Sequence, residues 1–187
     1  MKSLFSLPKL SIVVMLTSLT ACFGDDKPEV VPDQEVTLDY TQNLVMDLDT
    51  AAPMTGTYTR ELSPTVPHQG TESVKSVNIS KFSFKVISFN NGTNTLTYGT
   101  FKYFPMDNPS DVHTIYTIPA PGIKLSDLKL NGTESVFELS DTDKVTLGNL
   151  IKDEKPFKVI LEATVDRKPF TATMALHVEG KAVLKTI

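Results

Sequence analysis

Two segments near the C-terminus alternate apolar and mostly polar residues with a period of two. The apolar positions are the odd-numbered ones in residues 157–165 and the even-numbered ones in residues 170–178. Successive side chains of a strand point to opposite faces of a sheet, so this pattern is typical of antiparallel strands with one buried face. The short segment 166–169 between the two runs predicts that they form a closing β-hairpin.

Turn-forming residues separate further segments rich in β-branched and aromatic residues. A change of phase near Ser80 and Lys81 predicts a bulge in one long strand. The turn at Asn90-Asn91-Gly92 predicts a hairpin between that strand and the next one. Residues 44–48 are spaced as one helical face and indicate a turn of helix. The other strands expected are 36–40, 56–62, 74–89, 95–104 and 112–118. Residues 123–130, 135–139 and 144–151 are shorter strand candidates, and 182–187 is a candidate for a final edge strand.

These segments predict a single all-β antiparallel domain of about eight or nine strands over residues 36–187. No long amphipathic helix interrupts them. The pattern is compatible with a β-sandwich and with a flattened, partly open barrel. Apolar residues make up 40% of the chain, and Cys22 is the only cysteine. Without an intramolecular disulfide, the fold depends on its hydrophobic core.

The first 21 residues have the organisation of a secretory signal peptide. Lys2 and Lys9 give a positive start, and residues 10–21 form an apolar run that ends in the small residue Ala21. A transmembrane helix needs about 20 apolar residues. This run has twelve residues, four of which carry hydroxyl groups. We therefore expect a signal peptide rather than a membrane span.

The end of this segment, Leu19-Thr20-Ala21-Cys22, resembles the lipobox of bacterial lipoproteins. Leu19, Ala21 and Cys22 match the usual form, and Thr20 departs mildly from it. The resemblance implies cleavage before Cys22, a diacylglyceryl thioether on its sulfur and acylation of the new amino terminus. Each buried CH₂ contributes about 0.8 kcal/mol, so two or three chains would anchor the protein stably.

Residues 22–35 are predicted to be the lipidated cysteine and a flexible acidic tether. Residues 23–35 are poor in apolar side chains and would span about 20 Å root-mean-square as a flexible coil. Phe23 follows the cysteine, which by the sorting rule of enteric bacteria implies the outer membrane. Asp25 and Asp26 resemble the surface-export signal of Bacteroidetes lipoproteins, although a merely solvated linker has the same composition. The expected location is thus the outer membrane, on its periplasmic face or at the cell surface.

The overall layout is similar to that of small Bacteroidetes outer-membrane lipoproteins of unknown function. The likeness rests on the signal, the acidic tether, the strand beginning Gly56-Thr57-Tyr58, the segment Phe101-Lys102-Tyr103-Phe104-Pro105 and the closing pair of strands. Some members of that group are described as calycin-like. The resemblance carries no catalytic motif, and so it assigns no active site to this chain.

The charge of the chain argues against some classes of partner. The formal net charge is −4, and removal of residues 1–21 takes away two lysines and no acid, which makes it −6. Nucleic-acid binding needs clustered Lys and Arg, so no nucleic-acid partner is expected. An acidic surface is also not attracted to anionic lipid, and membrane contact should come from the lipid on Cys22.

No motif for catalysis, a metal or a cofactor stands out, and we predict none of the three. His68, His113 and His177 are isolated in sequence, and His177 falls on the polar, exposed phase of its strand. An EF-hand loop beginning at Asp47 or Asp141 would lack the Gly needed at its sixth position. The chain has no Gly-x-Ser-x-Gly motif, no phosphate loop and no dinucleotide fingerprint.

One modification pattern lies outside the signal. Asp49-Thr50-Ala51 resembles the three-residue O-glycosylation motif of Bacteroides envelope proteins, which implies Thr50 as a modified residue.

The sequence thus favours a membrane-anchored envelope lipoprotein that acts as a non-enzymatic binding module for an unidentified ligand. An internal apolar ligand would require the aromatic strands to line a cavity rather than to fill a core, and the core is favoured. Two alternatives remain at this level. One is a structural or accessory subunit of a surface complex, and the other is a hydrolase whose site forms only in the folded chain.

Overall fold

Nine β-strands and one short helix make up the part of the chain that the computed structural model describes, residues 32–90, 94–127 and 134–186. The number of strands agrees with the prediction. The elements in chain order are β1 (Gln34–Leu48), β2 (Thr55–Leu62), β3 (Glu72–Phe89), β4 (Thr95–Pro105), β5 (His113–Thr117), β6 (Ile123–Lys124), β7 (Ser135–Val136), α1 (Asp141–Lys152), β8 (Phe157–Val165) and β9 (Phe170–Thr186).

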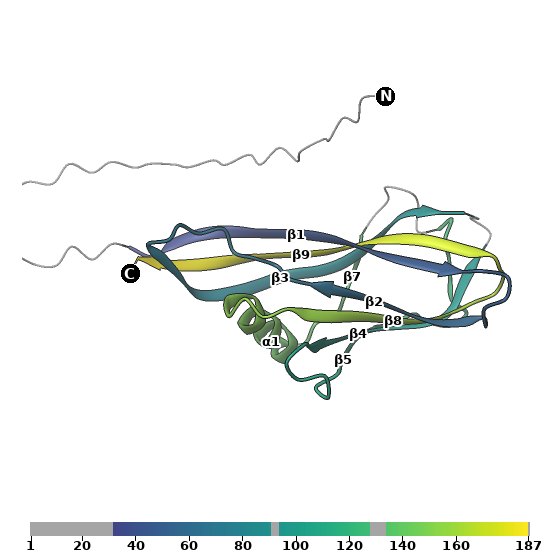
Figure 1. The fold of residues 1–187 in the computed structure, drawn as a ribbon. Coiled ribbons are helices and arrows are strands. Elements are labelled where there is room, and N and C mark those ends of the chain that lie inside the picture. The colour runs from purple at the N-terminus through teal and green to yellow at the C-terminus, as the bar shows by residue number, and fades with distance from the viewer. Residues whose placement is uncertain (1–31, 91–93, 128–133, 187) are drawn as a thin grey trace, which may run out of the picture. The chain divides into compact units, whose positions relative to one another are not determined.

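The strands form two antiparallel sheets that pack face to face as a sandwich (Figure 1). One sheet has the order β1-β9-β3-β7, and the other has the order β2-β8-β4-β5 with β6 paired to the start of β4. Of the two predicted architectures, the sandwich is the one observed. Within the described ranges the strands do not close into a barrel.

Strand β9 is the central element of the four-stranded sheet. It pairs with β1 along the whole of Gln34–Leu48 and with β3 from Glu72 to Phe89. Its residues alternate between buried and partly exposed positions, as its sequence predicts. Residues 182–186 are the end of β9, and residues 182–184 lie between β1 and β3, so the prediction of a separate edge strand there was wrong.

Both predicted hairpins were also wrong, although the strands themselves were correct. Strands β3 and β4 belong to different sheets, because β3 pairs with β9 and β7 while β4 pairs with β8, β5 and β6. In the same way β8 pairs with β2 and β4, not with β9. Each connection carries the chain from one layer of the sandwich to the other. Residues 91–93 of the predicted turn lie outside the described residues, as do residues 128–130 of the expected strand 123–130.

The predicted bulge in β3 is confirmed, since the register with β9 shifts between Ile79 and Lys81. The turn of helix expected at residues 44–48 is not formed. Strand β1 continues to Leu48 because β9 pairs with it throughout, and the side chain of Val45 is left 57% exposed between two buried neighbours.

Helix α1 occupies the segment 144–151, where a strand was expected. It begins after Ser140, whose hydroxyl accepts a hydrogen bond from the Asp143 backbone N–H while the Asp143 carboxylate accepts one from the Ser140 N–H. This capping box satisfies two otherwise unpaired donors. Leu147 and Ile151 are buried at helical spacing, which the short apolar run could not distinguish from a strand. Among the described residues, no helix has both the length and the hydrophobicity of a membrane span.

Aromatic side chains fill the space between the sheets. Phe84 on β3 stacks on Phe101 of β4 with ring centroids 4.8 Å apart, which joins the two layers. Phe137 lies 5.4 Å from Phe84 and 5.0 Å from Phe101. All three are almost fully buried. Because these rings contact one another, they act as core rather than as the lining of a cavity.

Helix α1 approaches β3 closely at Gly148. A Cβ atom added there would lie 2.5 Å from the backbone oxygen of Val77. Ala is ordinarily better than Gly inside a helix by about 1 kcal/mol. We expect Gly148→Ala instead to lower the free energy of unfolding by about 1–3 kcal/mol, because the helix must move away from β3. Urea unfolding measures this. The control is Asn149→Ala at an exposed position of the same helix, which should be neutral or slightly stabilising. A Gly148→Ala chain as stable as the wild type would contradict the expectation.

Candidate functional site

Charged side chains gather on the outward face of the four-stranded sheet, around β9. His177 and Glu179 are two residues apart on β9 and so project from the same face. The register places Ser83 of β3 opposite His177 and Lys81 opposite Glu179. Glu134 immediately precedes β7, which pairs with β3 beside Ser83. Three separate segments therefore deliver these five residues to one place.

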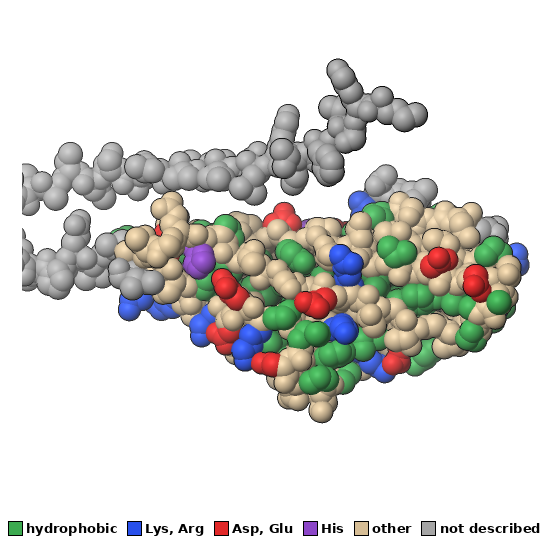
Figure 2. Space-filling model, viewed as in Figure 1, with side chains coloured by type: hydrophobic (Ala, Val, Ile, Leu, Met, Phe, Trp, Pro, Cys, Tyr) green, Lys and Arg blue, Asp and Glu red, His purple; other side chains and the backbone are tan. Residues whose placement is uncertain are grey.

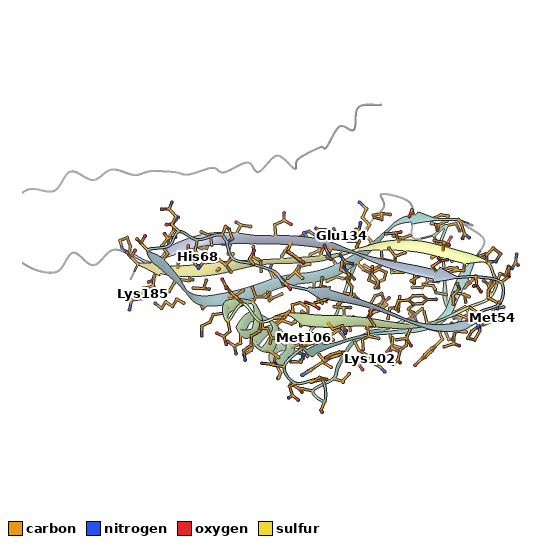
Figure 3. The ribbon with its side chains drawn as sticks, viewed as in Figure 1. Met54, His68, Lys102, Met106, Glu134 and Lys185 are labelled. Carbon is orange, nitrogen blue, oxygen red and sulfur yellow. The ribbon has the colours of Figure 1, made fainter. Side chains whose placement is uncertain are left out.

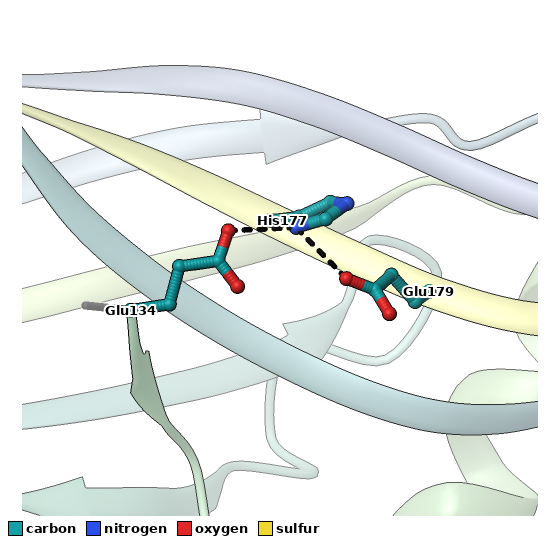
Figure 4. Close-up of side chains that lie close together, drawn as sticks. All are labelled: Glu134, His177 and Glu179. Atoms are coloured by element: carbon teal, nitrogen blue, oxygen red, sulfur yellow. Dashed lines mark hydrogen bonds and ion pairs between the residues drawn. The ribbon is translucent and has the colours of Figure 1, made fainter. Parts of the chain in front are cut away.

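The imidazole of His177 is surrounded by carboxylates (Figure 4). Its Nδ1 atom lies 3.0 Å from Glu134 Oε1 and 3.3 Å from Glu179 Oε1. Its Nε2 atom lies 2.9 Å from Oδ1 of Asp39 on β1. Glu134, His177 and Glu179 each offer one potential metal-ligand atom, and these atoms lie within 4.8 Å of one another. We call these three residues the Glu-His-Glu cluster.

Lys81 and Ser83 support the carboxylates of the Glu-His-Glu cluster. The Lys81 ammonium donates to Glu134 Oε2 and, at 3.1 Å, to Glu179 Oε1. The Ser83 hydroxyl donates to Glu134 Oε2 at 3.1 Å. The hydrogen bond from Lys81, followed by those from His177 and Ser83, outweighs partial burial and lowers the pKa of Glu134 to about 2. The hydrogen bonds that Lys81 donates to Glu134 and Glu179 raise the pKa of Lys81. Glu134 is thus an anion at neutral pH.

Sequence reasoning placed His177 on the polar face of its strand but expected it to be exposed. Its side chain is only 18% exposed, because Asp39, Glu134 and Glu179 enclose it. The sequence did contain a sign of the cluster, since His-x-Glu within a strand puts both side chains on one face. Glu134 could not be found in this way, because its position depends on the two-residue strand β7.

The second histidine, His113, belongs to a different cluster on the other sheet. Its Nδ1 lies 2.9 Å from Asp143 Oδ1 and its Nε2 lies 3.0 Å from Asp111 Oδ1. Its ring stacks on Tyr103, whose hydroxyl donates to Asp143 at 3.0 Å. The Ser140 hydroxyl also donates to Asp143, at 2.5 Å. This cluster joins the start of α1 to β4 and β5.

Two groups of the second cluster, Asp143 and Tyr103, have shifted pKa values. Burial by itself raises the pKa of Asp143, but hydrogen bonds from Ser140, Tyr103 and His113 outweigh it and the pKa is lowered. Burial, together with the Asp143 carboxylate, raises the pKa of Tyr103. Asp143 is 8% exposed. Its carboxylate oxygens accept hydrogen bonds from the helix cap, Tyr103 and His113, so this cluster has a structural role.

The three histidines do not converge. His68 is exposed in the loop between β2 and β3, and Figure 3 shows it well apart from Glu134, at the end of the domain where Lys185 lies. His113 and His177 belong to separate sheets. In the described part of the chain, the side-chain hydrogen bonds of His113 and His177 all go to carboxylates.

A serine, a glutamate and a histidine are in contact in the Glu-His-Glu cluster, but in the wrong order for nucleophilic catalysis. A hydrolytic triad needs the imidazole between the hydroxyl and the carboxylate, so that the imidazole can take the hydroxyl proton. Here Glu134 lies between Ser83 and His177. Ser83 is also completely buried. A substrate could not reach its hydroxyl.

Thr50, the predicted O-glycosylation site, lies in the exposed connection between β1 and β2. The carboxylate of Asp49 accepts hydrogen bonds from the backbone N–H groups of Ala51 and Ala52, both at 2.8 Å. The motif is therefore accessible and locally ordered, and modification of Thr50 stays a prediction. The lipidation residue Cys22 and the recognition residues Leu19, Thr20 and Ala21 lie outside the described residues.

Charges of both signs are interspersed on the face of the molecule seen in Figure 2. Some charged residues of the described chain form exposed ion pairs, such as Lys75 with Asp33 and Lys181 with Glu35. The visible face therefore has no continuous basic stripe.

No protein-family model matches this chain, and no curated protein matches it in sequence.

The hydrogen bonds of Asp143 give a test of the second cluster. We expect Asp143→Asn to lower the free energy of unfolding at pH 7 by about 1–3 kcal/mol, because hydrogen bonds to the ionised group are lost. Since folding lowers the pKa of Asp143, its stabilisation is complete above the ordinary value of 3.8 and declines as the pH falls below it. The difference between wild type and variant should therefore shrink in acid.

Urea unfolding at pH 7, 5 and 3 measures this difference. Asp141→Asn is the matched control, because Asp141 lies in the same first turn of α1 and is fully exposed. It should change stability little at any of the three pH values. Equal effects of the two substitutions at pH 7 would refute the structural role of Asp143.

Proposed function

We propose that this chain is a lipid-anchored lipoprotein of a bacterial cell envelope, whose β-sandwich serves as a non-enzymatic binding module. The observation that carries the proposal is Leu19-Thr20-Ala21-Cys22, placed directly after a positive start and a short apolar run. The only thiol of the chain lies at the position that the lipobox requires. An outer-membrane location, on the periplasmic face or at the surface, follows from Phe23 and the acidic tether.

The arrangement of polar side chains supports a binding role over a catalytic one. Nucleophilic catalysis needs a hydroxyl or thiol beside a base. His113 and His177 each face carboxylates on both ring nitrogens, and the buried Ser83 donates to Glu134 instead of to an imidazole. The polar groups of both clusters are thus arranged to hold one another or a charged partner.

The packing of the core favours a ligand site on the surface. Phe84, Phe101 and Phe137 bridge the two sheets in direct contact, and Tyr116 lies 5.8 Å from Phe84. An apolar ligand between the sheets would have to displace these rings. We therefore place binding on the outer faces of the sandwich. The net negative charge and the interspersed charges also argue against a nucleic-acid partner.

The anchor is tested by Cys22→Ala in a Gram-negative host fed a labelled fatty acid. We expect the wild type to carry label and to enter the detergent phase in Triton X-114 partitioning, because two or three acyl chains anchor stably. The Cys22→Ala chain should lose the label and remain in the aqueous phase after cell lysis.

Thr20→Ser is the matched control, because it restores a usual lipobox residue beside an unchanged cysteine. It should label as well as the wild type. A Cys22→Ala chain that still incorporates the fatty acid would overturn the proposal.

A further inference from the structure

The Glu-His-Glu cluster has the composition and spacing of a metal site. We propose that Glu134, His177 and Glu179 bind one divalent first-row transition ion such as Zn²⁺. The proposal concerns the sandwich itself and is independent of the lipid anchor.

The distances between the three potential ligand atoms fit such an ion. Zinc bonds of about 2.0–2.2 Å to nitrogen and oxygen give ligand atoms about 3.4 Å apart in a tetrahedral site. The Nδ1 atom of His177 lies 3.0 Å from Glu134 Oε1 and 3.3 Å from Glu179 Oε1. Small side-chain movements therefore suffice to place one ion between all three. Water would complete the coordination.

The other nitrogen of His177 is oriented as metal-binding histidines require. Such histidines usually donate their second ring N–H to a carboxylate or carbonyl, which fixes the tautomer. Asp39 Oδ1 lies 2.9 Å from Nε2 of His177 and accepts that hydrogen bond when the neutral imidazole carries its proton on Nε2, the tautomer that a metal ion on Nδ1 would select. The lone pair of Nδ1 then points at Glu134 and Glu179. Ser83 holds Glu134 through Oε2 and leaves Oε1 directed at the imidazole.

The carboxylate oxygens around His177 outnumber the N–H groups that its ring can donate, and a bound cation would satisfy them. Three carboxylate oxygens, from Asp39, Glu134 and Glu179, approach its two ring nitrogens. An imidazole carries at most two N–H donors, and carboxylates at neutral pH only accept. A metal ion on Nδ1 satisfies both glutamates at once. With the single positive charge of Lys81, the three carboxylates otherwise keep a formal charge of −2 when the imidazole is neutral.

Lys81 competes with the ion for only one of these oxygens. Its ammonium donates to Oε2 of Glu134, which is not the oxygen that faces His177, and to Oε1 of Glu179, which is. The Lys81 side chain is 29% exposed and long enough to turn towards solvent. Binding therefore requires the Lys81 ammonium to move away from Glu179 and leaves the backbone pairing of the sheet unchanged.

The donor set selects the class of ion. One imidazole nitrogen with two carboxylate oxygens suits Zn²⁺, Co²⁺, Ni²⁺ or Mn²⁺. Ca²⁺ prefers six to eight oxygen ligands, and Mg²⁺ keeps most of its water. The site should therefore bind Zn²⁺ and ignore millimolar Ca²⁺ and Mg²⁺.

The experiment uses the full chain carrying Cys22→Ala, which removes the only thiol that could bind zinc elsewhere. Zn²⁺ is titrated against a chromophoric chelator at pH 7.5, and Co²⁺ is added separately to record its visible spectrum. We expect one ion per chain. His177→Ala and Glu179→Gln should each weaken binding at least about tenfold, and Asp39→Asn should weaken it about 10–100-fold through the lost orientation of the imidazole.

Lys81→Met is the decisive variant, because it should tighten Zn²⁺ binding by removing the competitor. His68→Ala, at an exposed loop position, should change nothing. Circular dichroism checks that each variant is folded. Absence of Zn²⁺ binding by the folded parent chain, or equal binding by the His177→Ala chain, would overturn the proposal and leave the cluster as an ion-pair network. Failure of acyl labelling at Cys22 would overturn only the anchor.

Discussion

The pairing of β9 with both β1 and β3 is the interaction on which the rest of this structure depends. Thirteen consecutive residues of β9, 172–184, pair with β1 on one side and with β3 on the other, so their backbone donors and acceptors are directed at these two strands. The register is strongly specified, because a slip by one residue would turn the buried face of β9 towards water. The same register decides which outward side chains meet, so that His177 and Glu179 face Ser83 and Lys81 on β3 and Asp39 reaches them from β1. The alternation of side chains along β9 therefore places its apolar residues in the core and the residues of the charged cluster on the outer face.

The strands were predicted well because a strand that is buried on one face alternates apolar and polar residues along its own sequence. The runs 157–165 and 170–178 alternate as their observed burial does. The strand partners were predicted poorly, because the pattern reports which face is buried and not which neighbour lies alongside. The connections after Phe89 and after Val165 look like hairpin turns, yet each leads to the opposite sheet. In a sandwich both sheets bury one face equally well, so hydrophobic alternation cannot choose between them.

The one wrong element type has a similar cause. Leu147, Leu150 and Ile151 form a short apolar group that fits a strand or a helical face. What decides is the capping box of Ser140 and Asp143, which is visible in the sequence as Ser-x-x-Asp. In the sequence, Asp141 was instead considered as the start of an EF-hand loop, which lacks the Gly needed at its sixth position. In the fold, the Asp143 carboxylate accepts hydrogen bonds from the side chains of Ser140, Tyr103 and His113.

The contrast between the two histidine clusters explains why we assign binding to one of them. Both clusters place an imidazole between carboxylates, so their residue composition alone does not distinguish their roles. Asp143 is buried, and its oxygens are occupied by donors that the helix start and two strands hold in place. Glu179 is partly exposed, and the donor that faces its Oε1 is the ammonium of Lys81, at the end of a long and partly exposed side chain. A partner can replace a flexible side chain at little cost in folding energy, whereas replacing a capping interaction would destabilise a helix. We therefore expect ion binding at the Glu-His-Glu cluster on β9, and we expect the cluster at the start of α1 to stabilise the fold.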